Sequence, residues 1–296
     1  MITKGIDISR HQLGIDLAKV VRDNKIGFVV ARTTEGTYED PTWGAYRQIA
    51  AREGFLFAGY HKMSGDSSPM RQAAAIWNVV GDTGVPVIID LERLEGGTRQ
   101  PTYDDALHVI AAGKGLGLNM ARLIYLPGWY WAEIGYPMVQ RPVWESDYGP
   151  NDGKYPGDAS NAWVSANGLA KILQYTDKGR LSGYPDPLDI DAYRGTLEQL
   201  ARTGWFKDYR EDADVTKEEI QDAVRMTPIT VDSKGTVQPL QHVLRRILNR
   251  PDPDLHDLTE KISDAVVAAV HEQDVSDSEA LKKTVARTIR KALEVK

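Results

Sequence analysis

Short apolar runs rich in β-branched residues recur through the first two thirds of the chain, and longer segments of helical spacing separate the early ones. The apolar runs cover residues 5–9, 26–32, 55–61, 85–92, 122–126, 142–146, 171–176 and 187–193. The helical segments cover residues 15–24, 41–53, 69–80 and 102–116. Strands that alternate with such helices form βα units and a mainly parallel sheet. Eight strands favour a barrel over an open sheet. Because little helical sequence separates the later runs, we expect an irregular, TIM-like β/α barrel.

The pattern changes sharply near residue 210. All 7 Trp, 13 Tyr and 4 Phe lie at or before Tyr209, and Gly235 is the one glycine after Gly204. The change falls within a charged run at residues 207–214. A break of this kind is typical of a domain boundary, so we expect a barrel at residues 1–209 and a second domain at residues 210–296.

The second domain is expected to be small and all-α. Capping boxes begin at Thr216 and Ser276, and apolar residues follow at helical spacing. Each apolar stripe is narrow and each helix is short, so the helices must pack on one another, on the barrel or on another chain. We favour an independent module, whose helices bury their stripes against one another or against a second copy, over an appendage that packs on the barrel. Self-association would add avidity on a polymeric ligand.

Composition and charge exclude several classes of function. Of the 296 residues, 42% are hydrophobic and 26% are charged, as in ordinary globular proteins, and the net charge is −6. A net negative charge argues against nucleic acid or an anionic membrane as the main partner, because both need a basic face, so neither is an expected partner. The sequence has no apolar stretch of about 18 residues that would span a membrane. It also begins without a signal-peptide pattern, so we expect synthesis in the cytoplasm.

The absence of cysteine removes disulfides, thiol catalysis and Cys-ligated zinc. The sequence contains no phosphate-binding GxxxxGK[ST], no HExxH and no GxSxG motif. We therefore expect neither a metal nor another cofactor.

Acidic residues lie at the ends of three apolar runs. Asp90 and Glu92 are two residues apart, so they point to the same face of a strand. Asp7 lies in the first run, and Asp189 and Asp191 lie in the last. A single strand-terminal aspartate often caps a turn. Three runs that deliver acids at comparable positions instead indicate a shared site, where the proximity of two carboxylates raises the pKa of one of them.

A carboxylate cluster suits either glycoside hydrolysis or a site for a hard metal such as magnesium or calcium. Aromatic residues on or just after the same runs favour the first, because sugar rings pack on flat aromatic faces. These residues are Tyr60, Tyr125, Trp144, Tyr148 and Tyr175. Taken singly, each of them is more often a core residue than a sugar contact.

Eight motifs in order resemble those of the lysozymes of glycoside hydrolase family 25. They read GIDIS, RTTEG, GYHKM, VIIDLE, LIYLPGWYW, VWESDYG, LQYTDKG and LDIDAY, and they span roughly residues 3–195. The resemblance implies an irregular TIM-like barrel. It also implies cleavage of the β-1,4 bond from N-acetylmuramic acid to N-acetylglucosamine in peptidoglycan. Many members are phage endolysins.

The resemblance also implies roles for individual residues. Glu92 would be the general acid that protonates the leaving oxygen, and Asp90 would orient the substrate's 2-acetamido group or stabilise positive charge on it. Whether Asp90 or the acetamido group is the nucleophile stays open. Asp7 and Asp189 match the family's further aspartates and would orient the pair. The expected substrate-binding residues are Tyr60, Tyr125, Trp144, Tyr148, Gln174 and Asp191.

The sequence departs from the family pattern at three places. Lys62 replaces the phenylalanine that usually follows Tyr-His, and Asp191 replaces an asparagine. Glu145 and Asp147 add acids within the motif that contains Trp144. We expect these changes to make the rim of the site more charged without altering the proposed acids.

The leading function is therefore that of a peptidoglycan hydrolase, a phage endolysin released to the cell wall at lysis. Its expected partner is bacterial peptidoglycan. Two alternatives are a catalytically inactive carbohydrate-binding protein, for instance in a phage particle, and a hydrolase of another amino-sugar polymer such as chitin. The segment from residue 210 has no aromatic residue. It would therefore bind wall peptide or another polymer through charges and hydrogen bonds rather than by stacking on sugars.

Overall fold

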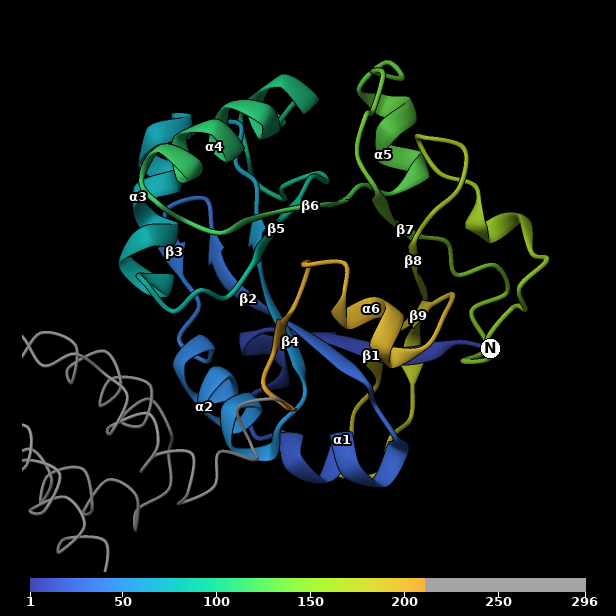
Figure 1. The fold of residues 1–296 in the computed structure, drawn as a ribbon. Helices are drawn as coiled ribbons and strands as arrows, with labels where there is room; N and C mark the ends of the chain where they lie inside the picture. Colours follow the sequence, from blue (N-terminus) through green and yellow to red (C-terminus); the bar gives the residue numbers. More distant parts are fainter. Residues whose placement is uncertain (211–296) are drawn as a thin grey trace, which may run out of the picture. The chain divides into compact units, whose positions relative to one another are not determined.

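The computed structural model describes residues 1–210, and eight of their strands close into a barrel (Figure 1). In barrel order these are β1 (Thr3–Ile8), β2 (Phe28–Glu35), β4 (Leu56–Lys62), β5 (Val87–Asp90), β6 (Met120–Tyr125), β7 (Val143–Ser146), β8 (Ile172–Gly179) and β9 (Leu188–Tyr193). All eight coincide with the predicted apolar runs. The expected irregular β/α barrel is thus confirmed, whereas the expected helical module lies outside the described residues.

Strand direction explains why the barrel is irregular. β1, β2, β4, β5, β6, β7 and β8 pair in parallel, whereas β9 pairs antiparallel with both β8 and β1. No helix lies between β8 and β9, and a connection without a crossover joins antiparallel strands. As a result, the beginning of β9 lies at the barrel end where the parallel strands finish.

Four helices follow the early strands, at the predicted places. They are α1 (Leu17–Asn24), α2 (Trp43–Glu53), α3 (Pro69–Val80) and α4 (Tyr103–Gly115). Local capping fixes where they begin: the Asp16 side chain accepts a hydrogen bond from the Lys19 amide before α1, and Thr102 forms a capping box with Asp105 before α4. No helix within residues 1–210 is long and apolar enough to cross a membrane.

Several short elements were not predicted. They are β3 (Tyr38–Glu39), β10 (Lys207–Asp208), α5 (Gly128–Glu133), α6 (Leu197–Ala201) and the 3-10 turns η1 (Arg10–Gln12) and η2 (Asn161–Trp163). β10 pairs with Leu56 and Phe57 at the beginning of β4. α6 lies in front of the barrel in Figure 1.

The barrel is filled with apolar side chains at the end where the parallel strands begin. Phe28 and Leu56 belong to this core, and Leu200 of α6 and Phe206 before β10 pack against it. The rings of Phe28 and Phe206 meet edge to face with centroids 5.1 Å apart. Residues 196–208 therefore close this end of the barrel and leave the opposite end open for a site.

Candidate active site

A pocket opens at the barrel end where the parallel strands finish, and nine of the ten predicted site residues line it. They are Asp7, Tyr60, Asp90, Glu92, Tyr125, Trp144, Tyr148, Gln174 and Asp189. Because β9 runs in the opposite direction, Asp189 at its beginning lies directly beside Asp7 near the end of β1 in the strand register. Residues from the beginning, middle and end of the barrel sequence thus share one pocket.

Asp90 and Glu92 are close to each other but differ in exposure. Asp90 ends β5 and is only 6% exposed, while the Glu92 side chain, just beyond the strand, is 22% exposed. Burial raises the pKa of Asp90 well above its usual value, and the Glu92 charge raises it further. Within residues 1–210, Asp90 Oδ1 is buried without a hydrogen-bond partner. Asp90 therefore favours its protonated form, while Glu92 is the acid that a ligand in the pocket can reach.

A second pair of acids lies across the seam between β1 and β9. Burial, followed by the charges of Asp189 and Asp191, raises the pKa of Asp7 well above its usual value. Burial raises the pKa of Asp189 to about 7. Neighbouring carboxyls of this kind share protons and titrate as a group. Near neutral pH this seam therefore holds protons that exposed aspartates would have lost.

Gln174 connects the acids to the aromatic residues. Its Nε2 donates to Asp7 Oδ2 at 2.6 Å. Its Oε1 accepts hydrogen bonds from Tyr125 Oη at 3.1 Å and Tyr148 Oη at 2.8 Å. The predicted substrate-binding residue Gln174 lines the pocket, but its amide is engaged with protein groups on both sides. It orients two rings and one carboxyl.

Asp191 is the predicted site residue that does not line the pocket. It is fully buried, and its Oδ1 accepts a hydrogen bond from Trp144 Nε1 at 2.8 Å. Burial raises its pKa well above the usual value. Its assignment to substrate binding stays a prediction. Asp191 lies on the same face of β9 as Asp189 but deeper in the barrel, where it holds the Trp144 indole.

The aromatic residues divide between the pocket and the core. Tyr125 and Trp144 line the pocket and meet edge to face with centroids 4.8 Å apart. Tyr60 and Tyr148 line it as well and are partly exposed. Tyr175, which the sequence also suggested for sugar contact, is a core residue that packs on Tyr155 and Trp163 in a separate cluster.

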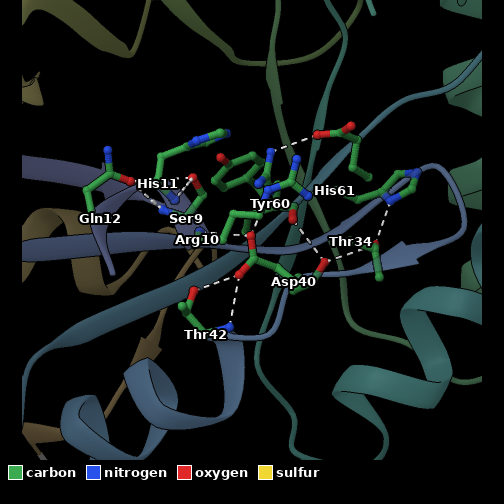
Figure 2. A network of polar contacts seen from close by, with 12 residues as sticks. Ser9, Arg10, His11, Gln12, Thr34, Asp40, Thr42, Tyr60 and His61 are labelled. Carbon is green, nitrogen blue, oxygen red and sulfur yellow. Dashed lines mark hydrogen bonds and ion pairs between the residues drawn. The ribbon is translucent and has the colours of Figure 1, made fainter. Parts of the chain in front are cut away.

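A buried ion-pair network holds the rim next to β1, and sequence reasoning did not identify it. Asp40 Oδ2 accepts hydrogen bonds from Arg32 Nε at 2.8 Å and from the Arg10 amide at 3.0 Å, while its Oδ1 accepts one from Thr42 Oγ1 at 2.6 Å (Figure 2). Ser9 and Gln12 form a capping box around the intervening turn. Ser9, His11, Gln12 and Arg32 line the pocket. The RTTEG motif contains Arg32, which was the available sequence signal.

His61, next to Tyr60, does not reach the pocket. It is fully buried, with Nδ1 2.7 Å from Thr34 Oγ1 (Figure 2). Its Nε2 lies 3.0 Å from Gln72 Oε1. Burial lowers its pKa to about 4, so the ring is neutral and holds β4 to its neighbours. Among residues 1–210, no group of three or more His, Asp or Glu side chains is arranged to hold a metal ion.

The two extra acids of the WESDY segment do not charge the rim, so that expectation was wrong. Glu145 is buried, and its Oε1 accepts hydrogen bonds from the amides of Gly128 at 2.5 Å and Ser146 at 3.1 Å. Burial raises the pKa of Glu145 to about 8. Asp147 is exposed, and its Oδ1 accepts a hydrogen bond from the Gly149 amide. Neither lines the pocket. Lys62 is the departure from the family pattern that does.

Comparison with known proteins agrees with this geometry. The family model described as "Glycosyl hydrolases family 25" matches residues 6–184. The uncharacterized protein YegX of Escherichia coli K12 is 26% identical over 209 residues, which cover 66% of this chain and 71% of that protein.

Solved structures share the fold. The lysozyme of Streptomyces coelicolor is 22% identical with a TM-score of 0.56, and the match covers 69% of this chain and 97% of that one. The catalytic domain of an endolysin from a bacteriophage of Listeria monocytogenes is 20% identical with a TM-score of 0.56, covering 69% and 98%. At these identities the likeness concerns the fold. The resemblance found in the sequence motifs is confirmed.

Proposed function

Because the chain belongs to glycosyl hydrolase family 25 and is therefore a glycosidase, we propose that it cleaves peptidoglycan between N-acetylmuramic acid and N-acetylglucosamine. The observation that carries this proposal is the pair at the end of β5, with a buried Asp90 of raised pKa beside a Glu92 that faces the pocket. Aromatic side chains line the same pocket, as a sugar-binding site requires. The neighbours of similar fold include a lysozyme and a muramidase, which supports the same substrate class.

In this proposal, Glu92 donates its proton to the glycosidic oxygen as the bond to C1 breaks. The 2-acetamido oxygen of the muramic acid residue attacks C1, and Asp90 orients that acetamido group for the attack. Water then attacks C1 and returns a proton to Glu92. Asp7, Asp189 and Gln174 act as positioning residues. Gln174 is hydrogen-bonded to Asp7 and to Tyr148, and this network surrounds the Asp90–Glu92 pair.

We further propose that the chain is an endolysin made in the cytoplasm that reaches the wall on release. The endolysin domain of similar fold supports this role. In the same proposal, residues 210–296 add wall binding or self-association to the barrel. The expected partner is the bacterial wall.

Glu92→Gln tests the proposal directly, because it keeps the side chain's shape and removes its titratable proton. We expect at least a hundredfold loss of cleavage, in line with the usual contribution of a general acid, and no change in wall binding. Asp90→Asn should cost nearly as much. Turbidity of purified cell walls and new reducing ends measure cleavage, and co-sedimentation with walls measures binding.

Glu95→Gln is the matched control, since Glu95 is exposed and lies outside the pocket lining. Full cleavage by Glu92→Gln would contradict the role of Glu92. Wall binding without cleavage by the unmodified chain would indicate the inactive carbohydrate-binding protein, and cleavage of chitin but not of walls would indicate another amino-sugar polymer.

A further inference from the structure

Lys62 contacts the proposed general acid. It ends β4, where it lies beside Asp90 of β5 in the strand register. Its Nζ donates to Glu92 Oε1 at 2.5 Å, and the two side chains are 21% and 22% exposed. Both line the pocket. The ammonium group therefore lies within the reaction site and between its two acids.

The surroundings keep Lys62 charged. Burial acts to lower its pKa, but the charges of Asp90 and Glu92, the hydrogen bond to Glu92 and the charge of Glu35 offset this, and the pKa of Lys62 is raised. In turn, Lys62 and Arg32 oppose the rise in the pKa of Asp90. The cation and the acid pair are thus coupled, and each proton bound by the pair weakens the attraction to Lys62.

This contact conflicts with proton donation. A general acid must carry a proton when the substrate is bound, whereas an ammonium group at hydrogen-bond distance favours the carboxylate. Proton donation from Glu92 to a substrate therefore requires that its contact with Lys62 Nζ open.

We propose that Lys62 is a positioning residue that withholds the catalytic proton from the Asp90–Glu92 pair until the ion pair opens, and that it thereby confines cleavage to lower pH. The inference rests on the proposed function. Phenylalanine, the residue of the family pattern at this position, would leave the pair without this cation.

Other charged and titratable groups face the pair from the neighbouring strands, and they are the same in every variant below. They are Asp7 of β1, Glu35 and Arg32 of β2, Tyr60 of β4, Tyr125 of β6, Tyr130 of α5 and Asp189 of β9. Because this background is constant, a change at residue 62 isolates the effect of its charge.

The test is the pH profile of kcat/KM for wall cleavage by the full chain. Lys62→Met removes the charge and keeps most of the side-chain length, and we expect the alkaline limb to move up by about one pH unit. Lys62→Arg keeps the charge and should leave the limb in place. Lys19→Met is the control, because it removes a unit charge from an exposed site outside the pocket.

Two outcomes would overturn the inference. One is an alkaline limb in Lys62→Met that coincides with that of the unmodified chain, whatever the change in rate, since the lysine would then only hold the Glu92 side chain. The other is a folded Lys62→Met that is inactive at every pH, since the lysine would then be required for the reaction itself.

A second measurement does not depend on activity. Carboxyl carbon NMR of the full chain follows the titration of Asp90 and Glu92 directly, with Asp90→Asn and Glu92→Gln to assign the signals. We expect the pair in Lys62→Met to retain its proton to higher pH, and identical titration curves would overturn the inference. If the unmodified chain failed to cleave walls but this shift appeared, the proposed function would fail while the control of the pair by Lys62 would stand.

Discussion

At the scale of single residues, the carboxyls of the barrel differ mainly in depth. Asp189 and Asp191 lie two residues apart on the same face of β9, yet Asp189 lines the pocket and Asp191 is fully buried. Burial raises the pKa of Asp191 well above the usual value, which favours the protonated side chain, and its Oδ1 still accepts the hydrogen bond from Trp144 Nε1. A protonated aspartic acid has nearly the shape and polarity of an asparagine.

Asp191→Asn should therefore be tolerated. We expect cleavage within about threefold of the unmodified chain. We also expect equal or higher stability at pH 7, because the substitution removes a buried acid whose ionisation burial disfavours. Asp191→Ala should instead destabilise by about 1–3 kcal/mol, because Trp144 Nε1 would lose its acceptor. Initial rates and thermal unfolding measure the two effects. A folded but inactive Asp191→Asn would show that the site needs this charge.

At the scale of elements, close packing inside the barrel constrains β1. A Cβ on Gly5 would lie 2.2 Å from the Phe28 ring, and Phe28 itself is part of the core that closes the barrel end. The side chain cannot move without disturbing Phe206, so strand β1 depends on this glycine for its place beside β2.

Gly5→Ala should destabilise the barrel by about 1–3 kcal/mol, the usual cost of overpacking a core. Gly44→Ala is the matched control: Gly44 is exposed on α2 with no atom within 4 Å of an added Cβ, so its replacement should be neutral or slightly stabilising. Urea unfolding followed by fluorescence compares them. Equal midpoints for the two variants would contradict this account.

The elements also show what periodicity can and cannot predict. The eight strands and four helices are long enough to display a period, whereas β3 and β10 have two residues each and α5 has six. Strand β2 continues to Glu35, beyond its predicted end at Arg32, with a register shift between Arg32 and Thr34. Nothing in the sequence of β9 itself indicates that it runs antiparallel to its neighbours. The absence of a helix between β8 and β9 was the available signal.

For the site, alternation predicts the face of a residue but not its depth. Alternation correctly placed Asp90 and Glu92 on the same face. It also placed Asp189 and Asp191 on the same face, but it could not show that Asp189 lies at the pocket and Asp191 in the barrel interior. Alternation also excludes Glu145 from the pocket, because its neighbour Trp144 lines the pocket and adjacent strand residues face opposite ways. The network around Asp40 joins Arg32 and Thr42 to the Arg10 amide, 30 residues earlier, and the RTTEG motif was the one sequence signal for it.

At the scale of the whole molecule, buried acids link stability to pH. Burial raises the pKa of Asp7, Asp90 and Asp191 well above the usual value, that of Asp189 to about 7 and that of Glu145 to about 8. The folded protein therefore binds protons that the unfolded chain releases above about pH 4. By linkage, the free energy of unfolding falls as the pH rises through these values.

The melting temperature of the barrel should accordingly be lower at pH 9 than at pH 5. All 7 Trp lie before residue 210, so tryptophan fluorescence follows the barrel alone. Glu145→Gln should flatten the decline between about pH 5 and pH 8, because one of the buried acids no longer has to ionise. A melting temperature that rises from pH 5 to pH 9 would contradict the prediction.

Residues 196–208 pack against the barrel end where the parallel strands begin. This packing determines where the chain can be cut without damaging the barrel. Thr3 Oγ1 donates a hydrogen bond to the Gly195 carbonyl at 2.9 Å. This bond links the beginning of β1 to the residues that follow β9. The family match ends at residue 184, but Leu200 and Phe206 fill the core well after it. A fusion of this barrel to a different domain should therefore be joined after residue 210, since a junction at residue 184 would remove Leu200 and Phe206 from the core.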